Sequence, residues 1–170
     1  MPTARDWADP FLAQATEDLR AAQATYLVKS PSTFCMLMQM TFEKLAKAAL
    51  ARQHIQPPLS HEVASRLLLL LERTPGGTSL PGVSIALVFV AVRDLENAQP
   101  AVVAQAMRNR GIPQYPQLEY PWEHPTSGAV EWPAQHLPMA KRIADPRDPI
   151  GPQLLKFAKA LEKQFNTLFP

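Results

Sequence analysis

Residues 31–56, PSTFCMLMQMTFEKLAKAALARQHIQ, form the longest stretch of the chain with a helical pattern. Ser30 suits an N-cap, and Pro31 suits the first helical position, where a missing N–H costs nothing. Pro57 and Pro58 restrain the backbone and end the pattern. Apolar or small side chains recur at steps of three and four, which places them on one helical face: Phe34, Met38, Thr41, Leu45 and Ala48. This stretch predicts a long helix around which the rest of the chain is organised.

The charged side chains of the same stretch lie off the apolar face. Lys44 and Lys47 fall on the opposite side of a helix with this pattern. Glu43 precedes Lys47 by one turn, a spacing at which opposite charges stabilise a helix modestly. We therefore expect these residues on the outer side of the helix.

Further helices are predicted before and after this one. The link from the first of them to residue 31 is so short that the two helices must pack antiparallel. The segment from residue 83 is rich in β-branched residues, but the chain offers no partner strand, and an isolated strand leaves its backbone groups unpaired. It is therefore predicted to be a helix. The helical ranges are 5–28, 61–72, 83–99, 101–110 and 152–168.

Residues 111–152 differ from the rest because they hold nine of the 18 prolines. Proline forbids regular helix over most of such a region and keeps the preceding residue extended. The region also carries Trp122 and Trp132, so its composition is not that of a flexible linker. The sequence predicts a single domain over 1–170. It is an all-α, up-and-down bundle of about five helices, with an irregular, ordered, proline-rich insertion at 111–150 before the last helix.

Composition narrows the class of protein. A chain of 170 residues with 46% hydrophobic residues can bury a real core. The net charge is +2, and no block of like charges indicates an extended phosphate-binding face. The single Cys35 fits a reducing compartment. Without a leader-like N-terminus or an apolar run of about 20 residues, we expect a cytoplasmic protein with no membrane contact.

The motif FEKLAKAAL, followed by a proline-rich turn and HEVASRLLLLL, resembles the HEPN family of helical domains. In that family an "EK-x-x-KA" helix precedes a short turn and a helix of the form "H-x-x-x-x-L". The opening of the chain, Trp7 with ATEDLRAA at 15–22, is similar to the family's first helix. The resemblance implies a helical bundle and a homodimer, and the apolar excess at 61–72 and 83–99 agrees with a dimer. The matching residues are Glu43, Lys44, Lys47, Ala48, His61 and Leu67–Leu71.

Catalytically competent HEPN proteins are metal-independent ribonucleases, and the resemblance implies an arginine and a later histidine with four to six residues between them. This chain has no such spacing. Tyr115 stands where the histidine would follow Arg108 or Arg110, but a phenol with a pKa near ~10 is a poor base at neutral pH. Both arginines also fit the ordinary role of cations that complement the dipole at the end of a helix. We therefore predict no catalytic residue.

Candidate binding residues are Arg108, Arg110, Tyr115 and His61. Cations and rings alternate between residues 108 and 122, as they do in sites for single-stranded nucleic acid, although an aromatic arm packed on the bundle explains the same pattern. His61 is either a binding residue, as the resemblance implies, or a neutral packing histidine at a helix start. No metal site is predicted, because the spacing of these acids and histidines matches no compact pattern: Glu123, His124, Glu131 and His136. No glycine loop indicates a nucleotide cofactor.

Three hypotheses for the function follow. The first is a non-catalytic module that binds RNA, a nucleotide or a partner protein, possibly within a toxin–antitoxin or defence system as the resemblance implies. The second is a divergent metal-independent ribonuclease that uses Arg110 with Tyr115, or a displaced histidine such as His124. The third is a structural subunit of a larger complex. The missing arginine–histidine spacing favours the first.

Overall fold

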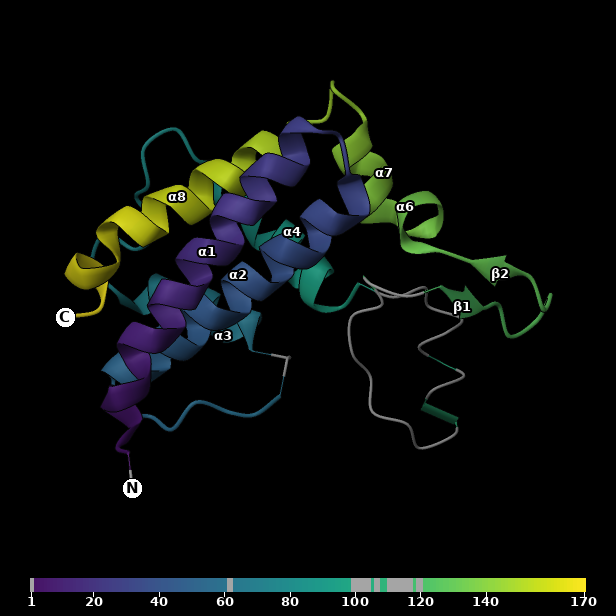
Figure 1. Cartoon of the computed structure of the whole chain (residues 1–170). Coiled ribbons are helices and arrows are strands. Elements are labelled where there is room, and N and C mark those ends of the chain that lie inside the picture. Colours follow the sequence, from purple (N-terminus) through teal and green to yellow (C-terminus); the bar gives the residue numbers. More distant parts are fainter. Residues whose placement is uncertain (1, 61–62, 99–104, 106–107, 110–117, 119–120) are drawn as a thin grey trace.

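The computed structural model of the chain is a bundle of helices with a small β-hairpin at one side (Figure 1). It describes residues 2–60, 63–98, 105, 108–109, 118 and 121–170. Apart from one pair of two-residue strands, the regular structure of this described part is helical, which confirms the predicted all-α bundle. The helices are η1 (Ala4–Trp7), α1 (Ala8–Leu27), α2 (Pro31–Arg52), α3 (Ala64–Arg73), α4 (Ile85–Glu96), α6 (Pro133–His136), α7 (Pro138–Ala144) and α8 (Ile150–Leu168).

Helices α1 and α2 form an antiparallel pair, as the short link predicts. Asp9 of α1 lies beside Arg52 near the end of α2, whereas Asp18 lies beside Lys44, so residue numbers rise along one helix as they fall along the other. The turn between the helices is closed by backbone bonds, including Ser30 N–H to the Thr25 carbonyl at 2.9 Å. Lys29 adopts a left-handed backbone conformation there, with φ at 56°.

Helix α2 is the central helix of the bundle and contacts α1, α3, α4, α7 and α8. It ends at Arg52, four residues before the predicted end. The N–H of Ile55 donates to the Leu50 carbonyl and that of His54 to the Ala51 carbonyl, both at 3.0 Å. With His54 at φ 59°, these two bonds form a Schellman motif, which closes the helix before the prolines are reached.

Helices α3 and α4 pack against α2 and against each other. The segment that contains α4 is a helix, as predicted. Glu96 at the end of α4 is buried, and its carboxylate accepts the backbone N–H of Ser65 in the first turn of α3, with N–O distances of 3.2 and 3.3 Å. An acidic group is favourable at this end of a helix, so α4 supplies the cap that the first turn of α3 needs.

The predicted proline-rich insertion at 111–150 precedes the last helix, but its described part contains regular elements that the sequence did not predict. Strands β1 (Trp122–Glu123) and β2 (Val130–Glu131) pair antiparallel, with Trp122 opposite Glu131, and the short helices α6 and α7 follow. Pro133 and Pro138 stand in the first turns of these helices, where proline is favoured because the first amides have no helical acceptor. Pro133 and Pro138, which the sequence predicts to break helices, therefore begin them.

Helix α8 covers the bundle and begins two residues before the predicted start. Its Phe157 is fully buried against Phe42 of α2 and Phe89 of α4, with ring centroids 5.6 and 6.1 Å apart. Gly151 lies against Tyr26: a Cβ at this position would be 2.6 Å from the tyrosine ring. A residue without a side chain therefore lets the first turn of α8 approach the end of α1.

Only part of the predicted helix at 101–110 can be compared with the structure. Gln105, Arg108 and Asn109 are helical, and the other residues of that range lie outside the described residues. None of the helices in the described part of the chain is long and apolar enough to cross a membrane.

Candidate functional site

The charged residues of the family-like motif are engaged inside the bundle. Lys47 and Glu43, predicted to lie on the outer side of α2, are instead 7% and 6% exposed, and Lys47 Nζ lies 2.7 Å from Glu43 Oε1. Gln39 donates to the same carboxylate at 3.3 Å, and Phe11 of α1 places its ring 5.8 Å from Lys47 Nζ. The prediction failed because α2 is covered on more sides than its apolar stripe indicates.

A second pair joins α1 to α2. Lys44 Nζ is bonded to the carboxylate of Asp18, which is buried and also accepts a bond from Gln14 at 3.3 Å. Buried charges are tolerated only when they are paired and hydrogen-bonded, and losing one partner is costly. These lysines and carboxylates therefore fix how the two helices pack.

Of the four predicted binding residues, the structure describes Arg108 alone. Arg108 is exposed and donates to Oε1 of Gln105, one turn earlier, at 2.9 Å. Arg110, Tyr115 and His61 lie outside the described residues.

The three described histidines are bound to their own local backbone or close a helix. His54 occupies the left-handed position after α2. His124 accepts the backbone N–H groups of Thr126 and Ser127 at Nδ1, both at 3.3 Å, within the loop of the hairpin. Nδ1 of His136 lies 3.1 Å from both the backbone N and the backbone O of Trp132. Among described residues, no group of three or more His, Cys, Asp or Glu is placed to hold a metal ion.

The single thiol of the chain is not a candidate nucleophile. Cys35 is fully buried in α2, and burial raises the pKa of its thiol to about 12. A cysteine reacts as the thiolate, so this side chain stays protonated and inert at neutral pH.

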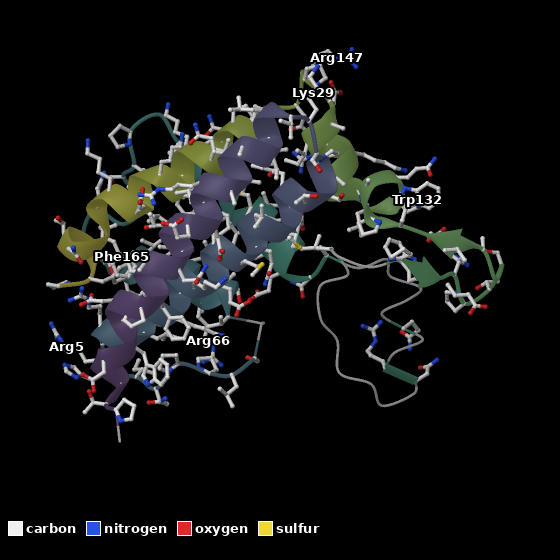
Figure 2. All side chains as sticks on the ribbon, in the orientation of Figure 1. Arg5, Lys29, Arg66, Trp132, Arg147 and Phe165 are labelled. Carbon is white, nitrogen blue, oxygen red and sulfur yellow. The ribbon has the colours of Figure 1, made fainter. Side chains whose placement is uncertain are left out.

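A cavity of about 470 Å³ lies between the start of α2 and the chain around the hairpin. We call it the Trp132 cavity. It is lined by Ser32, Thr33, Met36, Leu118, Pro121, Trp132, Pro133 and Ala134. Trp132 stands where the chain passes from β2 into α6 (Figure 2), and 45% of its surface is exposed. None of the described residues that line the cavity is charged, so this part of the lining suits a neutral, flat group.

The neighbouring Trp122 has a different environment. It is 8% exposed, and its indole N–H donates to Oε2 of Glu131 across the hairpin at 2.9 Å. Trp122 therefore belongs to the packing of the hairpin. The sequence interpretation grouped Trp122 with the candidate cations and missed Trp132 as a wall of a cavity. No local signal separates the two tryptophans in the sequence, because the cavity joins Trp132 to distant residues of α2.

A second cavity, of about 390 Å³, lies between the α1–α2 turn and the end of α7. Leu27 and Lys29 line one side of it, and Ile143 and Pro146 line the other. Leu27 is 72% exposed.

Comparison with known proteins gives one match. The model of the HEPN domain matches residues 8–83, which include α1, α2 and α3. No curated protein and no solved structure matches the chain. The matched range contains the FEKLAKAAL motif and the charge pairs that join or brace α1 and α2. Residues 8–83 of the chain are thus a match to the HEPN domain, and the family resemblance predicted from the sequence is confirmed there.

Proposed function

We propose that this chain is a non-catalytic interaction module of the HEPN type that binds RNA or a nucleotide. The environment of the described histidines supports the claim that the module is non-catalytic. His124 and His136 are held by backbone groups of their own loops, and His54 closes α2. A general base must reach the proton that it removes, and none of these rings stands beside an arginine at the family's catalytic spacing.

The arginine nearest to a described histidine in sequence is also engaged. Arg52 donates to Asp9 at 2.6 Å and to Asn166 at 3.2 Å, and so links α2 to both α1 and α8. These two bonds give Arg52 a structural role. Arg52 and His54 are therefore not proposed as a pair that acts on a phosphodiester.

The ligand class is supported by the family match and by the Trp132 cavity. HEPN proteins with catalytic activity act on RNA, so the family match favours RNA or a nucleotide as the ligand class. The Trp132 cavity offers a flat aromatic wall, and its described lining residues carry no charge. Base stacking on such side chains is worth about 1–3 kcal/mol per base.

The test is to incubate the purified chain with mixed RNA in the presence of a chelator, beside an Arg110→Ala variant. Neither protein should cleave the RNA. Binding of a labelled single-stranded RNA, followed by fluorescence anisotropy, should be measurable at low salt and weaker at high salt. Metal-independent cleavage that is lost in Arg110→Ala would make the chain a divergent ribonuclease instead, and the absence of any RNA or nucleotide binding would refute the proposal.

We also propose that the chain forms a homodimer through α3 and α4. Leu69 on α3 is 47% exposed and Val90 on α4 is 53% exposed, and such side chains gain from burial against a second copy. Light scattering should give twice the mass of the chain, and Leu69→Asp should shift the protein towards the monomer. A wild-type monomer at all accessible concentrations would exclude this dimer, whereas co-purification with one fixed partner would favour a subunit of a larger complex.

A role in a toxin–antitoxin or defence system is the biological setting that we propose for this module, in the cytoplasm. The inert, buried thiol of Cys35 agrees with a reducing compartment. The neighbouring reading frame provides the test: an adjacent nucleotidyltransferase-like protein that binds this chain on co-expression would support a toxin–antitoxin pair, and its failure to bind would contradict that pair.

A further inference from the structure

We propose that the Trp132 cavity binds one unpaired nucleobase, supplied either by single-stranded RNA or by a free nucleotide. The inference rests on the proposed function and assigns its site. The cavity joins the start of α2, which lies inside the family match, to residues beyond position 83, where the match ends.

Trp132 is held in place although almost half of it is exposed. The ring of His136 stands edge-on against the indole, with centroids 4.9 Å apart and planes at 78°. The same imidazole contacts the backbone of Trp132 through Nδ1, and Pro133 fixes the next residue at the start of α6. An aromatic ring that is already ordered loses little conformational freedom when a ligand stacks on it. Trp132 is therefore a preorganised stacking surface.

The remaining walls fit the edge of a base. The hydroxyl of Ser32 makes no hydrogen bond within the described part of the chain, whereas that of Thr33 is shared with Ser30 at 3.0 Å. Hydroxyl groups both donate and accept, so they suit the mixed donors and acceptors of a base. Met36 adds a polarisable apolar surface. A neutral ring system fits this lining better than a phosphate or a carboxylate, because no cation is among the described residues that line the cavity.

The other large cavity does not offer the same arrangement. Its aromatic residue, Tyr26, already packs against Phe34, with ring centroids 5.1 Å apart, and against Gly151. Its lining includes the charged Lys29. The volume of the Trp132 cavity, about 470 Å³, is within the range of about 300–1,000 Å³ typical of small-molecule sites.

The experiment measures binding of a labelled oligoadenylate and of adenosine monophosphate to the full chain. Trp132→Ala should weaken oligoadenylate binding about tenfold or more, the loss expected for one stacked base, while Trp132→Phe should retain most of the affinity. Trp7→Ala is the matched control, because Trp7 is 42% exposed but lies in η1 against Phe11. Ala134→Leu fills the cavity from its exposed α6 side and should cause the same loss without removing the indole.

The two ligands separate the two sources of the base. If adenosine monophosphate quenches the fluorescence of the wild type but not that of Trp132→Ala, a free nucleotide is sufficient. If only the oligoadenylate binds, and Trp132→Ala weakens it, the base comes from RNA. Unchanged oligoadenylate binding in folded Trp132→Ala and Ala134→Leu would place RNA elsewhere, overturning this site but not the proposed function. No binding of either ligand to the wild type would overturn both.

Discussion

The α1–α2 pair and the hairpin with α6 are held together in different ways. The helices are 20 and 22 residues long and share a continuous buried interface with charge pairs along it. The hairpin has two-residue strands, and single side chains hold it: Trp122 to Glu131 and His136 to Trp132. The first region derives stability from many small contacts. The second derives a defined shape from a few contacts and leaves Trp132 available to a ligand.

The largest expected difference between the two regions is in the free energy of unfolding after one apolar truncation. Phe42→Ala removes a ring that is 0% exposed and packs on Phe157, which should cost about 3–5 kcal/mol. Val130→Ala in the hairpin, where the side chain is 67% exposed, should change stability by less than about 0.5 kcal/mol. Urea unfolding measures both. Equal decreases in the free energy of unfolding would mean that the hairpin unfolds together with the helical core.

The charge pair between α1 and α2 should give the next effect. Lys44→Met leaves Asp18 buried without its cation and should cost on the order of 2–3 kcal/mol, somewhat less than for a fully enclosed pair. The double variant Asp18→Leu with Lys44→Met removes both charges and should be more stable than the single variant. Thermal unfolding of all three proteins is the measurement. A double variant that is less stable than Lys44→Met would show that the pair itself is not the cause.

The hairpin should respond locally to the loss of its indole hydrogen bond. Trp122→Phe keeps a ring in the same place but removes the donor to Glu131, which should cost about 1 kcal/mol. Hydrogen exchange at the amide of His124, which donates to the Ala129 carbonyl at 2.8 Å, should become faster, while amides in the middle of α2 keep their protection. Faster exchange throughout α2 would contradict the independence of the two regions.

The smallest expected effect lies where α7 turns into α8. Bonds from Arg142 and from the backbone N–H of Ile150 hold the pKa of Asp148 below its usual range. A lowered folded pKa stabilises the protein above the unfolded pKa, near ~4, and this contribution is lost as the pH falls through the folded value. Asp148→Asn should therefore lower stability by less than about 1 kcal/mol at pH 7, and the gap to the wild type should close in acid. A difference in stability between Asp148→Asn and the wild type that widens below pH ~4 would contradict this prediction.

The same contrast explains what the sequence could predict. Helical periodicity and the residues that begin or end a helix are local signals, so the sequence locates the helices over 5–28 and 31–56 to within a few residues. The motif in these helices also indicates the family. Glu43 and Lys47 look like a surface pair in sequence, because only the packing of other elements around α2 buries them. A three-dimensional arrangement of this kind has no local signal.

The hairpin and the cavity were missed for a related reason. The sequence analysis treats the prolines of this region as helix breakers. Pro133 and Pro138 instead stand in the first turns of helices, because the effect of a proline depends on its position in the helix. The Trp132 cavity joins residues near position 33 to residues near position 133, a pairing that neither segment encodes alone. The sequence identified aromatic residues in the arm, and the structure determined which of them lines a cavity.

The carboxylate of Glu96 couples the movements of two helices. It is 6% exposed and serves as acceptor for the first turn of α3. Displacing α4 away from α3 would separate the carboxylate from the amide of Ser65 and leave that amide without its acceptor, a cost that opposes independent movement of either helix. A second molecule that binds α4 and shifts it would therefore shift α3 as well, and the two helices would move together.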